Sequence, residues 1–429
     1  MHSQIIKLSI PNIISNITVP LLGMVDMMIV GHLGSEVMIG AMALGAAIFN
    51  FIYWSFAFLR MGTSGFTAQA YGARDMREMS SSLLRSLAVA LAVGLTLVVF
   101  QYPLGKMMLW IMDGSNEVTA FASSYFFARI WAAPATLSLN AIQGWYIGMQ
   151  NSRLPMYMSI VINILNIGFS LFFVFVLDMG FVGIAWGTVV AQYGGLLMGV
   201  ILWLVHYKRM SKYFDLGHAM KLSAMLRFFN VNRDIFIRTA CIVTVFTFFT
   251  SLSARQGDML LAVNMLLMQL FTLFSYVIDG FAYSAESLIG KFEGAGNMPA
   301  IKKCLRQLFM WGFGLAMIFV AVYVVFWQEL LGLFTDSTQV IEMARGYIGW
   351  IIAVPLITFI PFVIDGALIG ATKNVIMRKT VFFSAIMFFV VFYLCQPFMG
   401  NDALWLAFMA FMVSRGLSQY VMLRPLGWF

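Results

Sequence analysis

Charged residues are scarce in this chain of 429 residues: 10% are charged, while 61% are hydrophobic. A soluble protein carries roughly a quarter charged residues, so this composition excludes an ordinary water-exposed surface. Most of the chain is therefore expected to be solvated by lipid.

Cysteine and histidine are also rare. The three cysteines, Cys241, Cys304 and Cys395, have no spacing typical of a disulfide framework or a metal site. No histidine pairs with an acid at helical spacing inside a long apolar run, so an intramembrane enzyme with a nucleophile, base or metal ligand is not expected. We expect no cofactor.

The chain also lacks a signal-peptide cleavage site after its first apolar run, so this run is expected to remain as a helix. The net charge of +8 comes from residues between apolar runs, which favours contact with a membrane and no nucleic acid partner.

Long apolar runs are abundant. Each is long enough to cross a hydrocarbon core of ~30 Å, and none alternates with the period of a barrel strand, so each predicts a helix. The twelve predicted segments are 6–30, 38–61, 83–104, 119–147, 154–176, 181–206, 234–254, 259–288, 305–328, 341–370, 376–396 and 402–424.

Most Lys and Arg residues lie at the two termini and in every second loop, as do Arg74, Arg77, Lys302 and Lys303. Cytoplasmic loops carry the excess of positive charge in membrane proteins. This pattern predicts a multi-pass protein of the bacterial inner membrane with both termini in the cytoplasm, and we expect a monomer.

The two halves of the chain resemble each other at an offset of about 222 residues, which indicates an internal repeat. The matched positions are Gly34 with Gly257, Gly72 with Gly294, Pro134 with Pro355, Gly144 with Gly366 and Gly148 with Gly370. Each half has six predicted helices, so both halves have the same orientation, as in transporters with parallel repeats.

The expected fold is therefore an all-α integral membrane protein. Twelve transmembrane helices form two pseudo-symmetric six-helix bundles around a central cavity. The predicted N-terminal lobe covers 1–206, a cytoplasmic linker covers 207–233, and the C-terminal lobe covers 234–429.

One acid and several polar residues share a depth in the predicted N-terminal lobe. Asp26 lies near the outer end of the first helix, and Asn163, Asn166, Ser170 and Thr188 lie on the fifth and sixth. A buried carboxyl binds a proton more readily, and one with oxygen neighbours could hold Na⁺. Intramembrane acids are functional by default, the alternative being a structural Asp neutralised by hydrogen bonds.

The C-terminal half carries Asp279, Glu286 and Asp365 inside predicted helices. They could form ion pairs that close the cytoplasmic side, with partners such as Arg60 and Arg238, or they could bind a cation or substrate directly.

Three further residues are candidates for a role in transport. Asn140 and Gln143 lie on the fourth segment and could line the cavity or its gate. Pro11 in the first helix removes a hydrogen bond and favours a kink, which could couple protonation of Asp26 to a change of shape.

Several ordered motifs resemble the multidrug and toxic compound extrusion (MATE) family, in the branch named for DNA-damage-inducible protein F. The resemblance covers nearly the full length. The matching stretches are Val25-Asp26-Met27 with Gly31-His32-Leu33-Gly34, Phe58-Leu59-Arg60-Met61-Gly62-Thr63 with Thr67-Ala68-Gln69-Ala70, Asn232-Arg233-Asp234, Asp279-Gly280-Phe281-Ala282-Tyr283 with Glu286, and Asp365-Gly366 with Ile369-Gly370-Ala371-Thr372.

This resemblance implies a secondary antiporter that exports organic cations or amphipathic toxic compounds in exchange for H⁺ or Na⁺. It assigns the coupling acid to Asp26, with Asn166 and Thr188 beside it as the set that could hold Na⁺, and assigns helix bending to Pro11. Some members carry a second Asp where this chain has Ser170. The pocket thus has one carboxylate, which leans towards H⁺ and leaves Na⁺ open.

Two other functions remain as alternatives at this point. A lipid-linked oligosaccharide flippase of the same superfamily would favour a basic cavity, whereas Arg129 is one of few basic residues within the segments. An intramembrane enzyme ranks lowest because a catalytic constellation is missing.

Overall fold

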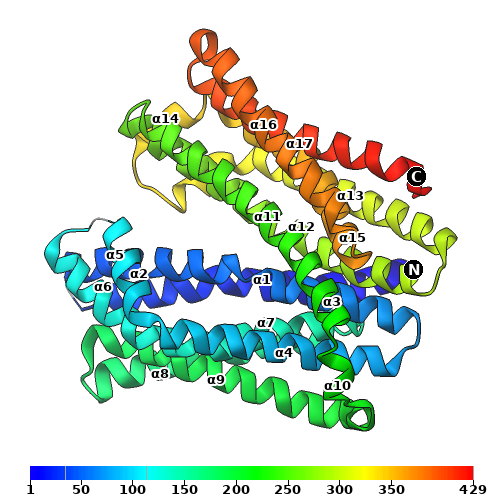
Figure 1. Cartoon of the computed structure of the whole chain (residues 1–429). Coiled ribbons are helices and arrows are strands. Elements are labelled where there is room, and N and C mark those ends of the chain that lie inside the picture. The colour runs from blue at the N-terminus through cyan, green and yellow to red at the C-terminus, as the bar shows by residue number, and fades with distance from the viewer. Residues whose placement is uncertain (34, 113, 429) are drawn as a thin grey trace. The chain divides into compact units, whose positions relative to one another are not determined.

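In a computed structural model the chain is built of helices, and no strand occurs in the parts described (Figure 1). The structure describes residues 1–33, 35–112 and 114–428. Gly34, one of the glycines matched by the repeat, lies outside the described residues. The prediction of an all-α fold is confirmed.

Helices occupy all twelve predicted segments, but several begin or end at other residues, and breaks at 56–57, 100 and 345–347 divide three of the segments. Their bounds are α1 (His2–Gly31), α2 (Glu36–Ser55), α3 (Phe58–Gly72), α4 (Met76–Val99), α5 (Gln101–Met112), α6 (Asn116–Arg129), η1 (Ile130–Ala132), α7 (Ala133–Gly148), α8 (Arg153–Leu171), η2 (Phe172–Val176), α9 (Gly180–Tyr207), η3 (Lys208–Tyr213), α10 (Leu216–Ala219), α11 (Leu222–Ala254), α12 (Asp258–Gly294), α13 (Met298–Gly332), α14 (Thr338–Ala344), α15 (Ile348–Gly370), α16 (Asn374–Met399), α17 (Asn401–Leu423) and η4 (Arg424–Leu426).

Eleven helical stretches of the described chain are long and apolar enough to cross a membrane. The remaining predicted segment, 119–147, is also helical, but the short 3₁₀ turn η1 divides it into α6 and α7. Pro134 stands in the first turn of α7, a position where its missing N–H has no intrahelical partner to lose.

The described residues form two compact units. The N-unit comprises Ile14–Asn232, and the C-unit comprises Met1–Ile13 together with Arg233–Phe429. Both changes of unit occur inside a continuous helix, one in α1 and one in α11.

The first part of α1 packs on α12 within the C-unit. A Cβ added to Gly280 would lie 3.0 Å from the Ser9 carbonyl oxygen, so glycine permits this close approach. One turn further, the Ser9 and Ser284 hydroxyls are 2.8 Å apart. These contacts hold the turn that contains Pro11 against α12.

The first part of α11 makes the corresponding contact with α3 in the N-unit. Gly62 leaves room for the buried Asn232 side chain, and the rings of Phe66 and Phe228 stack with centroids 5.9 Å apart. Helix α11 therefore begins at Leu222, well before the predicted start at 234. The apolar run marks only the part that spans lipid, whereas hydrogen bonding and packing continue the helix into polar sequence.

The internal repeat is visible in two pairs of helix crossings. A Cβ at Gly144 would overlap the Arg60 carbonyl oxygen, and one at Gly366 would overlap the Ala282 carbonyl oxygen. One turn on, Gly148 and Gly370 meet the carbonyl oxygens of residues 64 and 286 in the same way. All four partners obey the offset of about 222 residues, so α3 crosses α7 as α12 crosses α15.

Short elements after α9 fix the polar stretch to α4. The Asp215 carboxylate caps α10 by accepting from the His218 backbone N–H, and Arg77 donates to it at 2.5 Å. These two donors, the backbone one first, hold the pKa of Asp215 below its ordinary value. The buried Arg85 donates to the Ala219 carbonyl and to Glu78.

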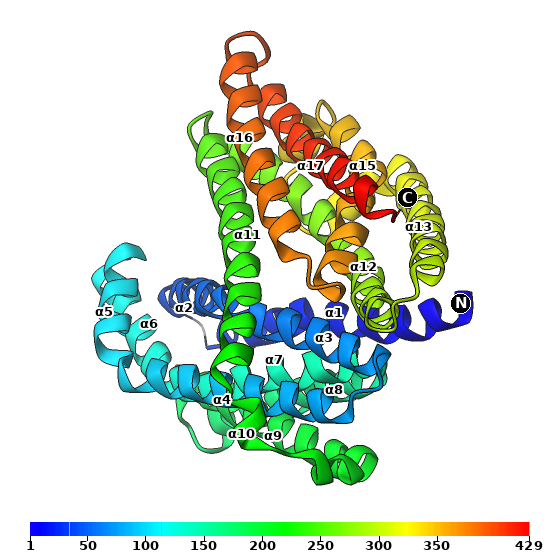
Figure 2. The ribbon, with the colours of Figure 1, turned by 45° about the vertical axis from the view of Figure 1, so that its right-hand side comes forward.

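The core of the C-unit packs around aromatic residues of α11, α12 and α17. The rings of Phe249 and Trp405 meet edge to face at 5.1 Å, and the Trp405 indole donates to Asn264 at 2.9 Å. Asn264 also exchanges hydrogen bonds with Asn401. Helices α16 and α17 form a hairpin whose arms lie side by side in both views (Figures 1 and 2).

Candidate functional site

Asp26 is a buried acid on α1 within the N-unit, with 5% of its surface exposed. Its Oδ1 has no hydrogen-bond partner among the described residues. Neighbours on both sides of it, such as Val25 and Met27, pack in the same apolar cluster as Phe49 and Tyr125. Because an ionised carboxylate in such surroundings is costly, a proton or cation bound at Oδ1 would stabilise Asp26.

Arg129 at the end of α6 is the charged group that acts electrostatically on Asp26. Its Nη1 donates to the Tyr125 hydroxyl at 2.6 Å, and its guanidinium carbon lies 4.8 Å from the centroid of the Phe49 ring. The Arg129 Nε is buried and has no partner in the described part of the chain. Aromatic faces thus hold this cation near the acid without a direct ion pair.

Of the polar residues predicted to share one depth with Asp26, Asn166 of α8 and Thr188 of α9 form a direct contact. The Asn166 Nδ2 donates to the Thr188 Oγ1 at 3.0 Å, and Thr188 donates to the Ile184 carbonyl. The Asn166 Oδ1 and Ser170 Oγ are buried acceptors without a described partner. Among the described contacts neither joins Asp26 directly, so these oxygens and Asp26 Oδ1 are separate unsatisfied groups.

Asn163, one turn before Asn166, points its amide elsewhere. Its Nδ2 donates to the Thr18 carbonyl of α1 at 3.1 Å. Asn163 therefore ties α8 to the helix that carries Asp26, eight residues before the acid.

The other candidates of the N-terminal half lie on α7, on α3 and in the first part of α1. Asn140 and Gln143 on α7, together with Arg60 on α3, are half-buried. Pro11 is buried in the part of α1 that belongs to the C-unit, and α1 continues as one helix through it.

Asp365 on α15 is the centre of an ion-pair cluster in the C-unit. Its Oδ2 accepts from Arg238 at 2.5 Å and from the buried Arg415, while its Oδ1 accepts from Gln419 at 2.5 Å. Two cations and an amide therefore satisfy both oxygens of one carboxylate that is 3% exposed.

Asp279 and Glu286 lie on α12 on either side of its contact with the first part of α1. Glu286 is 1% exposed and Asp279 is half-buried. Asp279 acts electrostatically on Arg415, so it belongs to the surroundings of the Asp365 cluster.

Comparison with protein families gives a match over both halves. The MatE family model matches residues 11–172 and again residues 235–394. The chain belongs to the MatE family. The double match supports the internal repeat, because one family model fits each half.

Two curated relatives agree with this family assignment. The chain is 35% identical to DNA damage-inducible protein F of Escherichia coli over 96% of this chain and 89% of that protein. It is 22% identical to the probable multidrug resistance protein NorM of Rhizobium meliloti over 73% of this chain and 68% of that protein.

Solved structures agree on the fold. A MOP superfamily transporter from Pyrococcus furiosus superposes with a TM-score of 0.86 at 20% identity, covering 99% of this chain and 95% of that one. The Vibrio cholerae MATE transporter VcmN in the bent form superposes with a TM-score of 0.87 at 17% identity, covering 99% and 96%. The prediction of a twelve-helix MATE/MOP-type fold is confirmed.

Membership of this multidrug efflux family makes the chain a multi-pass membrane transporter, and members of the family are not enzymes. The flippase alternative finds no support in these relatives and is dropped. Family membership does not by itself assign roles to individual residues of this chain.

Sequence reasoning missed two partners of Asp365. Arg415 and Gln419 lie one turn apart within the predicted segment 402–424, and an Arg inside an apolar run was a signal that could have found the first. It also passed over Tyr125, since an ordinary aromatic in a helix gives no sign that it binds Arg129.

Proposed function

We propose that this transporter is an antiporter that exports organic cations or amphipathic toxic compounds in exchange for H⁺ or Na⁺. The observation that carries the proposal is the buried Oδ1 of Asp26, which has no partner among the described residues and lies on a candidate membrane-spanning helix. The names of the relatives, among them multidrug resistance and detoxification proteins, support the substrate class.

Asp26 is the exchange site in this proposal. A proton arriving from outside neutralises the carboxyl and removes the cost of a charge in apolar surroundings. A cationic substrate stabilises the ionised form instead, so the two ligands compete for one acid. Arg129 limits how much cationic charge the site accepts, because like charges repel.

We favour H⁺ as the coupling ion. Among the described residues of the N-unit, Asp26 is the one buried acid, and Asn166, Ser170 and Thr188 offer buried neutral oxygens. Sodium is held by oxygen ligands that include charge, and a serine hydroxyl at residue 170 supplies less charge than a second carboxylate would. Protonation needs only the one free acceptor.

Pro11 supplies the flexible point in the proposed cycle. The turn around it is held on α12 by Gly280 and Ser284, while Asn163 holds the same helix at Thr18. Proline has removed a helical hydrogen bond in the first of these anchored turns, so a bend there changes the direction of α1 on the way to Asp26.

The cluster around Asp365 acts as a structural or gating ion pair in this proposal. Both of its oxygens already have donors, so an incoming ion would have to displace an arginine or the Gln419 amide.

We further propose that the protein is a monomer. We also propose that it lies in the inner membrane with both termini in the cytoplasm, since the Lys and Arg residues alternate accordingly.

The test is efflux of a fluorescent organic cation from vesicles that contain the purified protein. An imposed pH gradient and an imposed Na⁺ gradient are applied separately to the parent and to Asp26→Asn. We expect the pH gradient to drive efflux by the parent and not by the variant. Equal efflux by both proteins would contradict the assignment of Asp26, and efflux driven only by Na⁺ would contradict proton coupling.

A further inference from the structure

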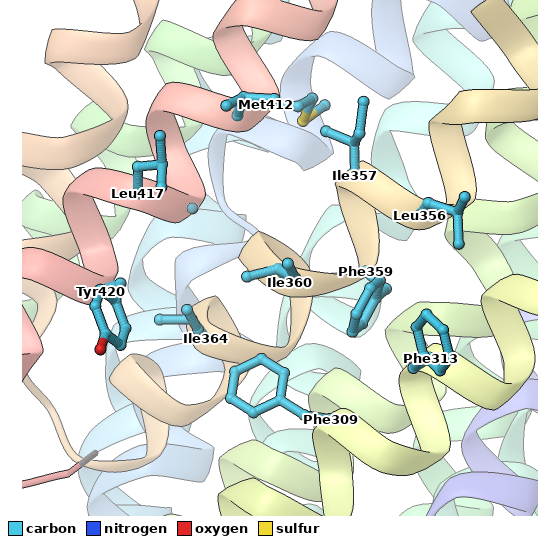
Figure 3. A pocket seen from close by; sticks show the side chains of 12 residues that line it. Phe309, Phe313, Leu356, Ile357, Phe359, Ile360, Ile364, Met412, Leu417 and Tyr420 are labelled. Carbon is cyan, nitrogen blue, oxygen red and sulfur yellow. The ribbon is translucent and has the colours of Figure 1, made fainter.

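An apolar groove lies between α13, α15 and α17 of the C-unit, with a cavity volume of about 590 Å³ (Figure 3). Among its lining side chains only the Tyr420 hydroxyl is polar. Figure 3 places Tyr420, Ile364 and Phe309 towards one end, and Met412 and Ile357 towards the other.

Small and rigid residues keep the groove open. A Cβ added to Gly416 of α17 would already lie 3.4 Å from Ile360 Cγ2 and 3.6 Å from Pro361 Cδ. Any longer side chain at residue 416 would therefore occupy the space next to α15. Two prolines inside α15, Pro355 and Pro361, remove hydrogen bonds from the helix that forms the floor.

Two exposed arginines stand close in sequence to the residues at the Tyr420 end of the groove. Arg306 precedes Phe309 by about one turn of α13. Arg424, the first residue of η4, follows Tyr420 by about one turn, so each arginine shares a face with a groove residue. Both side chains are exposed, and neither forms an ion pair with a described residue. The groove is thus apolar along its length and positively charged at one end.

We propose that this groove binds an anionic phospholipid. One acyl chain lies between α13, α15 and α17, and the phosphate contacts Arg306 and Arg424. All three helices belong to candidate membrane spans, so acyl chains are the medium that meets this surface. Guanidinium groups bind phosphate oxygens in pairs of hydrogen bonds, and basic clusters at helix ends attract anionic lipids.

The positive charge of Arg306 and Arg424 favours an anionic phospholipid over a transported cation. An amphipathic cation would fit the apolar part but would be repelled by the two arginines. A zwitterionic lipid would fill the same space with less attraction at the headgroup. The proposal does not depend on Asp26 or on the coupling ion.

The experiment uses photolabelling in nanodiscs of phosphatidylcholine. A trace of phosphatidylglycerol with a diazirine in its acyl chain is activated by light, and labelled peptides are located by mass spectrometry. We expect label on the α13 and α17 segments that line the groove. Unlabelled phosphatidylglycerol should compete about tenfold better than added phosphatidylcholine, because two arginines contact its headgroup.

Two variants test the two halves of the site. Arg306→Ala with Arg424→Ala should lower the labelling and abolish the preference for phosphatidylglycerol, with Arg255→Ala as a matched exposed control. Gly416→Leu should block labelling by either lipid, with Gly314→Leu on α13 as control, since nothing lies within 4 Å of a Cβ there.

Three results would overturn the proposal: labelling that neither variant reduces, equal competition by the two lipids, or displacement of the label by a fluorescent organic cation. The last would make the groove a substrate site. If Gly416→Leu does not fold, the exposed arginine pair decides the question alone.

Discussion

Asp26 and Asp365 are both acids buried in membrane-spanning helices, yet their surroundings differ. Asp26 leaves Oδ1 without a partner among the described residues, whereas Arg238, Arg415 and Gln419 satisfy both oxygens of Asp365. A buried acid with a free acceptor can take up a proton or cation. A buried acid with all its acceptors filled holds helices together.

The repeat sharpens this contrast because the backbones correspond. At the offset of about 222 residues, Gln143 stands where the C-unit has Asp365, and Ser64 stands where it has Glu286. The glycine crossings at Gly144 and Gly366 are alike. The same helix scaffold therefore carries neutral side chains in one half and acids in the other, so the scaffold alone does not place the chemistry.

The largest expected effect is on stability, from Asp365→Asn. This change leaves Arg238 and the buried Arg415 without a counter-charge, which costs about 3–5 kcal/mol. A thiol-reactive dye that reports the exposure of buried Cys304 should show a clearly lower unfolding temperature. Asp336→Asn, at an exposed position, is the control, and equal unfolding temperatures for the two variants would show that the cluster is not structural.

The helix crossings should be the next most sensitive. Gly144→Ala and Gly366→Ala each force two helices apart, which costs about 1–3 kcal/mol by overpacking. The two variants should lose similar stability because the crossings correspond, whereas Gly168→Ala and Gly314→Ala, with nothing within 4 Å, should not. A large loss in one half only would break the structural equivalence of the halves.

A smaller effect is expected from Thr188→Val. The change keeps the shape but leaves the Asn166 amide without its acceptor, which costs about 1 kcal/mol. The unfolding temperature in detergent is the measurement, and Thr244→Val, at an exposed hydroxyl on α11, is the control. A Thr188→Val protein as stable as its parent would mean that Asn166 finds another acceptor, such as water.

The smallest effect is expected at the surface, at Asp215. Its pKa is lowered in the folded protein, so its stabilising contribution is present at neutral pH and is lost as the pH falls below about 4. Limited proteolysis within 208–222 should become faster over that range. Asp215→Asn keeps the helix cap but should remove the pH dependence, and an unchanged dependence would assign it to another group.

The sequence was sufficient for the helices, the repeat and the residues that approach one another on α8 and α9. Apolar runs and charge placement are properties of single segments, and spacing along a helix gives depth. The pairing of Asp365 with Arg415 was not foreseeable in this way, because it depends on how α15 packs against α17. The start of α11 at Leu222 was not predicted for a similar reason, because Phe228 and Asn232 pack against residues of another helix.

The central claim is that Asp26 couples ion flow to export, and substrate counterflow tests it most directly. Counterflow measures exchange of labelled for unlabelled substrate without any ion gradient, in parallel with gradient-driven efflux. We predict that Asp26→Asn retains counterflow but loses gradient-driven efflux, while Glu36→Gln, at an exposed acid on α2, retains both. An Asp26→Asn protein that keeps parental gradient-driven efflux would contradict the claim.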